Sequence, residues 1–255
     1  MAIIKNEIPI LEFDTEQTAV LNPTHENLSL HLPEKCVFAF LGEHITAYAE
    51  KAESAKVAEF VSMTKRYPIY VTKHKGEEIT LCEAPVGSAA AAQILDWLIG
   101  YGVRKIISAG SCGALERFDE GTFLVPYKAL RDEGTSYHYA PPSRYIEIGE
   151  SAREAIKKAI LAHGMKYQEV ITWSTDGFYR ETKDKVAYRK SEGCAVVEME
   201  CAALAACADF RGATWGMILY TADSLADVDK YDERNWGGNA CEYALSLCLD
   251  AIIHL

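Results

Sequence analysis

The stretch VVEMECAALA, residues 196–205, places two carboxylates where an apolar strand turns into an apolar helix. Val196 and Val197 are typical of the end of a buried strand, and the small residues at the end of the stretch favour a tightly packed helix. Glu198 and Glu200 lie between them, two positions apart, so both side chains would point the same way in an extended segment. Two acids at such a junction indicate either a helix start that balances the helix dipole or a binding site.

The rest of the chain alternates in the same way between short apolar segments and helical segments. Such alternation, with near-continuous apolar strands, indicates an α/β fold. We predict a single α/β domain at 35–255, with a mixed central β-sheet flanked by helices, and an extended N-terminal arm at 1–34. The expected strands are 36–42, 67–85 (two strands joined by a turn at 75–76), 104–107 (which feeds a small-residue loop at 108–115), 122–130, 169–175, 194–199 and 213–223. The expected helices are 46–62, 88–102, 151–164, 182–193, 200–212 and 240–255.

Composition narrows the class of partner. The 255 residues carry a net charge of −11, which argues against a nucleic-acid or anionic-membrane surface. The eight cysteines form no C-x-x-C pair and sit among apolar residues, so we expect buried thiols in a reducing cytoplasm and no metal site. The opening MAIIKNEIPILEF is interrupted by polar residues and proline, and we expect neither a signal peptide nor a membrane span.

Two further segments follow expected strands, at the edge where α/β proteins bind ligands. The first, SAGSCGAL at 108–115, lacks the lysine-containing P-loop pattern, but its small residues expose backbone N–H groups suited to an oxyanion. The second, TADSLAD at 221–227, contains Asp223. This aspartate is either a turn or helix-capping residue or a general acid for a leaving group that departs as an anion.

Glu200 is the acid nearest the expected helix start. A positive helix end favours a charged carboxylate, so we expect Glu200 to stay ionised. An ionised, fixed carboxylate is a good acceptor for two vicinal hydroxyls and favours a neighbouring cationic centre. The alternative is a glutamate that only complements the helix dipole.

Four stretches in order carry a resemblance to a known family. VVEMECAAL resembles the V-E-M-E-x-x-A-L signature of the trimeric/hexameric nucleoside phosphorylases, which include purine nucleoside phosphorylase, uridine phosphorylase and methylthioadenosine nucleosidase. SAGSCGAL is similar to the phosphate and ribose loop of that family. RDEGTSYHY at 131–139 and STDGFYRET at 174–182 resemble its uridine phosphorylase-like members.

The resemblance implies a role for each matching residue. Glu200 and Asp223 would be catalytic, Glu200 on the ribose hydroxyls and Asp223 on the departing base. The remaining implied residues form three groups: ribose (Met199, Glu198, Ser111 and, from a neighbouring subunit, His25), phosphate (Gly42, Ser108, Gly110, Ser111 and, from a neighbour, Arg66 or Lys65) and base (Phe178, Gly113, Asp223). It also implies a homo-oligomer built from dimers, up to a hexamer.

The sequence departs from the family at its phosphate arginines. Ser108 stands where an arginine is usual, and the segment GEHIT at 42–46 replaces G-D-P-x-R, so Thr46 takes the place of another arginine. The leading hypothesis is a phosphorylase, a pentosyltransferase that splits a nucleoside with inorganic phosphate as co-substrate and no other cofactor. A nucleosidase that uses water and a non-catalytic nucleoside-binding relative are the alternatives. Asp223, together with Thr182 and Asp184 at the uracil-reading positions, favours a purine over uracil.

Overall fold

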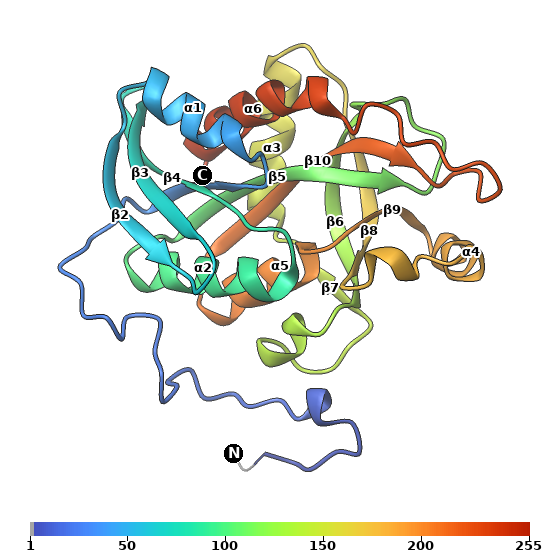
Figure 1. Ribbon diagram of the computed structural model, residues 1–255, viewed down its shortest axis with the longest axis horizontal. Helices are drawn as coiled ribbons and strands as arrows, with labels where there is room; N and C mark the ends of the chain where they lie inside the picture. Colours follow the sequence, from blue (N-terminus) through green and yellow to red (C-terminus); the bar gives the residue numbers. More distant parts are fainter. Residues whose placement is uncertain (1–2) are drawn as a thin grey trace.

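The computed structural model describes residues 3–255 and shows a single α/β domain with a mixed sheet (Figure 1). The strands are β1 (Lys35–Ala39), β2 (Ala55–Val61), β3 (Arg66–His74), β4 (Glu77–Glu83), β5 (Lys105–Ala114), β6 (Phe123–Asp132), β7 (Tyr145–Glu147), β8 (Gln168–Thr175), β9 (Cys194–Glu198) and β10 (Thr214–Ser224). The α-helices are α1 (Glu43–Lys51), α2 (Ser88–Gly100), α3 (Glu150–Ala162), α4 (Lys183–Ser191), α5 (Cys201–Phe210) and α6 (Cys241–Ile253). Short 3₁₀ turns are η1 (Pro9–Leu11), η2 (Thr135–His138), η3 (Phe178–Arg180) and η4 (Gly238–Ala240).

Strand β5 is the centre of the sheet. It pairs along one edge with β10, in parallel, over residues 105–114. The other edge is shared, because β1 pairs in parallel with residues 105–107 and β9 pairs antiparallel with residues 113–114. β1 and β9 therefore run toward each other, and their C-terminal ends meet beside the middle of β5. Because the partner of β5 changes from β1 to β9 at this point, the strands separate there, and such a switch point is where α/β proteins bind ligands.

Helices cover both faces of the sheet. α2 and α5 pack together on one face with the cluster that contains Trp97, Leu98 and Leu204. α1, α3 and α6 cover the other face with a second cluster. Figure 1 shows the two layers above and below the strands, with β2 and β3 at one end of the molecule and α4 at the other. Burial of these apolar faces stabilises the domain at roughly 25 cal/mol per Å².

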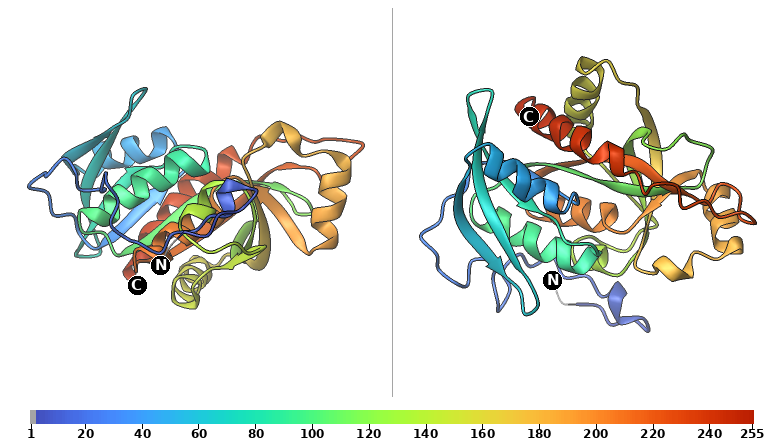
Figure 2. Two further views of the ribbon diagram at one scale, coloured as in Figure 1. Left: turned by 90° about the horizontal axis from the view of Figure 1, so that it is seen from below. Right: turned by 45° about the horizontal axis from the view of Figure 1, so that its top comes forward.

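The arm before β1 crosses the α2 and α5 side of the domain without a regular strand (Figures 1 and 2). Arg211 connects the arm to α2, because its guanidinium donates to the Gln17 carbonyl at 2.7 Å and forms an ion pair with Asp96 at 2.7 Å. Glu26 accepts from the Trp97 indole at 2.9 Å.

The expected elements are confirmed in most places, and the turn at 75–76 is present with positive φ at Lys75 and Gly76. Two expectations were wrong, and one strand was overlooked. The helix expected at 46–62 ends at Lys51, and its second half is β2, since that segment pairs with β3. SAGSCGAL is not a loop, because pairing with β10 keeps it extended to Ala114. β7 was missed.

Candidate active site

A cavity of about 410 Å³ lies where β1 and β9 converge on β5. β5 contributes small residues, β9 and the turn after it contribute two acids, and β10 contributes another. The lining residues are Phe40, Val86, Gly110, Ser111, Cys112, Gly113, Phe178, Glu181, Val197, Glu198, Met199, Glu200, Met217, Ala222, Asp223 and Trp236. Predicted residues from distant parts of the sequence are thus brought together in one site.

Glu198 is a supporting acid at the end of β9. Its Oε2 accepts the backbone N–H groups of Glu200 at 2.7 Å and Cys201 at 2.6 Å, the first residues of α5. Its Oε1 accepts the hydroxyls of Thr172 at 3.1 Å and Ser174 at 2.6 Å. Burial raises the pKa of Glu198, and these hydrogen bonds oppose that rise. The side chain therefore ties β8, β9 and α5 together.

Glu200 occupies the N-cap position of α5 and is only 6% exposed. Its Oε1 accepts the N–H of Gly87, the N-cap residue of α2, so two helix starts meet at this carboxyl. Burial, with the adjacent Glu198, nevertheless raises the pKa of Glu200 to about 8. The expectation of a fully ionised Glu200 at neutral pH was wrong, because desolvation outweighs the favourable helix ends.

Met199 lies between the two acids and lines the cavity. Its carbonyl accepts the Ser88 hydroxyl of α2 at 2.5 Å, which fixes the turn from β9 into α5. The position of Met199 gives the cavity an apolar wall beside Glu200.

The small residues of β5 bring its backbone to the wall of the cavity. A Cβ on Gly110 would lie 3.2 Å from the Met217 side chain and 3.3 Å from Phe40, so the space beside it is filled. Ser111, in contrast, is exposed on the cavity side. Its hydroxyl is a donor available to a ligand.

A bulge in β10 sets the direction of the Asp223 side chain. The register of β10 against β5 shifts between Thr221 and Ser224, and a bulge of this kind redirects a side chain. The side chain approaches Gly113, where an added Cβ would lie 3.3 Å from Asp223 Oδ1. Burial raises the pKa of Asp223, while a hydrogen bond from Tyr231 lowers it. A raised pKa makes a carboxyl bind its proton more readily, which suits a general acid.

Several predicted residues lie elsewhere in this chain. Ser108 is fully buried and accepts the Trp215 indole N–H at 3.0 Å, so it does not reach the cavity. Gly42 lines an adjoining cavity of about 350 Å³ that also contains Lys65 and shares Phe40 and Val86 with the first.

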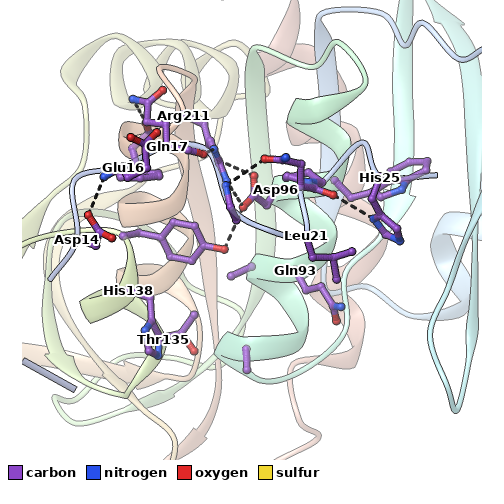
Figure 3. Close-up of a pocket in the computed structure, with 18 of the residues that line it drawn as sticks. Asp14, Glu16, Gln17, Leu21, His25, Gln93, Asp96, Thr135, His138 and Arg211 are labelled. Atoms are coloured by element: carbon purple, nitrogen blue, oxygen red, sulfur yellow. Dashed lines mark hydrogen bonds and ion pairs between the residues drawn. The ribbon is translucent and has the colours of Figure 1, made fainter. Parts of the chain in front are cut away.

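Arg66 and His25 are also outside the acid-lined cavity. Arg66 is exposed and paired with Glu59 at 3.1 Å. His25 lies in a larger cavity of about 680 Å³ beneath the N-terminal arm, near Leu21 and Gln93 (Figure 3). That cavity contains neither Glu200 nor Asp223. A role for either residue in a neighbouring subunit's site remains a prediction.

Sequence reasoning missed Glu181 and Trp236. Glu181 is the C-cap residue of η3, which begins at Phe178, and burial together with Asp223 raises the pKa of Glu181 to about 7. Trp236 has a φ of 53°, an unusual conformation for a bulky residue, while the flanking N–H groups of Asn235 and Gly237 bind Glu120. The stretch STDGFYRET contains Glu181, and its acid was a usable signal, whereas the sequence offered no signal for Trp236.

A model of one protein family, the phosphorylase superfamily, matches residues 34–254 of the chain. The chain belongs to the phosphorylase superfamily. The match begins just before β1 and leaves out most of the N-terminal arm. Across residues 3–255, no three His, Cys, Asp or Glu side chains are grouped to hold a metal ion, and no helix there is long and apolar enough to cross a membrane.

Curated members of the superfamily with similar sequences include two phosphorylases. Guanosine phosphorylase of Halorubrum lacusprofundi is 27% identical over 172 residues, which cover 66% of this chain and 70% of the relative. Uridine phosphorylase of Haemophilus influenzae is 25% identical over 141 residues, which cover 53% of this chain and 56% of the relative. The matched segment thus spans little more than half of the uridine phosphorylase.

Solved structures of the superfamily share the fold. AMP nucleosidase from Bacteroides thetaiotaomicron superposes with a TM-score of 0.71 at 26% identity, covering 87% of this chain and 88% of that one. Uridine phosphorylase from Vibrio fischeri superposes with a TM-score of 0.75 at 21% identity, covering 88% and 93%.

Proposed function

We propose that this protein cleaves the N-glycosidic bond of a purine nucleoside, with inorganic phosphate as the acceptor. The observation that carries the proposal is the presence of two separate acid groups in one cavity. Glu198 and Glu200 follow β9, whereas Asp223 lies near the end of β10. The reaction would release the free base and ribose 1-phosphate, as in a pentosyltransferase.

The two acid groups match the charges that develop as the bond breaks. The sugar ring gains positive charge, which the ionised form of Glu200 stabilises while it accepts the ribose hydroxyls, with Met199 beside the sugar. The developing cation favours that ionised form and so opposes the burial that raises the pKa of Glu200 in the unliganded protein. The base gains negative charge, which Asp223 relieves by donating its proton to the base. Groups fixed in advance around both charges lower the barrier because they need no reorganisation during the reaction.

Phosphate as acceptor is supported by the phosphorylase relatives and by the cavity that adjoins the site. Ser111 presents a hydroxyl, and Lys65 lies with Gly42 in the adjoining cavity. Lys65 is paired with Glu83 at 2.6 Å, so phosphate would compete with that carboxylate for it. A homo-oligomer in which a neighbour supplies a further cation is part of the proposal.

Hydrolysis is the second candidate, and the charge of the cavity favours it. The sixteen lining residues include Glu181, Glu198, Glu200 and Asp223, but no lysine, arginine or histidine. A phosphate dianion is held poorly without cationic partners, whereas water needs none. The similarity of the fold to that of an AMP nucleosidase also supports this second candidate.

A nucleoside panel tests both candidates. The full chain is incubated with adenosine, inosine, guanosine and uridine, with and without phosphate, and the sugar product is identified. Phosphate-dependent formation of ribose 1-phosphate from a purine nucleoside supports the proposal, and phosphate-independent release of free ribose supports hydrolysis. Binding of nucleosides without release of any base would contradict both and indicate a binding protein.

A further inference from the structure

Glu181 is a second acid at the Asp223 side of the cavity, and neither the sequence prediction nor the proposed chemistry uses it. It follows η3 directly, and both Glu181 and Phe178 line the cavity with Asp223. Glu181 is half-buried, and the more a carboxylate is withdrawn from water, the more its charge must be balanced by a partner or a proton.

The charged groups around Glu181 come from three segments. Burial, with Asp223 on β10, raises the pKa of Glu181, and Lys185 on α4 lowers it, while Tyr231 from the loop after β10 hydrogen-bonds Asp223. Lys185 itself forms an ion pair with Asp132 at 2.9 Å. Arg234 lowers the pKa of Asp223, but its guanidinium donates to the Phe118 carbonyl at 2.6 Å. Glu181 and Asp223 line the same cavity, and repulsion between two such carboxyls favours a state in which one of them keeps its proton.

A carboxyl pair with one proton presents one donor and one acceptor. Purines carry two neighbouring polar positions on the edge that includes N7, namely N7 and the substituent at position 6. In adenine these are an acceptor and an amino donor, whereas in guanine and hypoxanthine both are acceptors. The singly protonated pair is complementary to the adenine edge and leaves an unpaired acceptor against a 6-oxopurine.

We infer that Glu181 is a specificity-determining residue that accepts a hydrogen bond from the 6-amino group of the base, so that the site selects 6-aminopurine nucleosides. The inference rests on the proposed function, which puts Asp223 at N7. Phe178 and Trp236, which also line the cavity, offer aromatic faces that stack on any base and do not discriminate between them.

The test compares binding of free adenine and free hypoxanthine to the full chain by calorimetry at pH 8, where Glu181 is ionised. Wild type is expected to bind adenine roughly tenfold more tightly, about the discrimination that one base-edge contact supplies. Glu181→Gln, whose amide can donate as well as accept, should lower that ratio at least about fivefold. Glu181→Asp, which keeps the charge, should retain a preference for adenine.

Glu233→Gln is the matched control, since it removes the same charge from an exposed residue near the cavity and should leave the ratio unchanged. Lowering the pH from 8 to 6 should reduce the wild-type ratio but not that of Glu181→Gln, a response that a purely structural role would not give. A ratio that Glu181→Gln leaves unchanged, or no preference for adenine in wild type, overturns the inference. Preference for adenine without cleavage of any nucleoside would support the inference and refute the proposed function.

Discussion

Glu198 Oε2 accepts the backbone N–H of Glu200 at 2.7 Å, so the first acid of the opening stretch holds the second in place. The two carboxyls face different partners. That of Glu198 is surrounded by donors from β8 and α5, and that of Glu200 binds Gly87 and lines the cavity. Two acids with one residue between them thus have unequal tasks, one structural and one directed at a ligand.

Removal of the Glu198 side chain should unfold the protein more readily. Glu198→Ala leaves the N–H groups of Glu200 and Cys201 and the hydroxyls of Thr172 and Ser174 without their acceptor. We expect a loss of about 3–5 kcal/mol in the free energy of unfolding, measured by urea titration at pH 7. A loss below about 1 kcal/mol would show that water or neighbouring groups replace this acceptor.

A methyl group on Gly113 should disturb the site beside Asp223. The Cβ of Gly113→Ala would lie 2.9 Å from Leu225 Cδ1 and 3.0 Å from Val197 Cγ1. We expect a loss of about 1–3 kcal/mol in stability and a fall in kcat for nucleoside cleavage, because Asp223 must shift. Gly134→Ala is the control, since its Cβ would meet nothing closer than 3.7 Å. Equal activity of both variants would contradict this account of the small residue.

The unliganded protein should lose stability as the pH rises from about 5 to about 8. The pKa of Glu200 is raised to about 8 and that of Glu181 to about 7, whereas an unfolded chain titrates its glutamates near 4.3. The folded state therefore binds more protons across this window, and its stability is lost as these groups ionise. Melting temperatures at several pH values measure the effect, and Glu200→Gln should flatten the slope. An identical slope in wild type and variant would argue against a raised pKa at Glu200.

The sequence was informative where a local pattern decides the outcome. VVEMECAALA predicted a strand that ends at the acids and a helix that follows, and β9 ends at Glu198 while α5 begins at Cys201. The alternation of apolar and helical segments likewise predicted the α/β class, because central strands such as β5 and β10 are buried between helices.

Features that depend on distant partners could not be predicted in this way. Burial raises the pKa of Glu200, and the backbone N–H of Gly87, which is 113 residues away, opposes that rise. SAGSCGAL stays extended because β10 pairs with it along its length. Ser108 faces Trp215 instead of the cavity, and no spacing rule reveals on which side of a buried strand a small residue will point.

Glu200→Gln tests most directly the claim that Glu200 stabilises the sugar as the glycosidic bond breaks. The substitution keeps the shape of the side chain but prevents it from ionising as positive charge develops on the sugar. We predict that kcat/KM for the best purine nucleoside falls by about 10²–10³-fold, while the variant remains folded and the exposed control Glu78→Gln keeps wild-type activity. Unchanged kcat/KM in a folded Glu200→Gln protein would contradict the central claim.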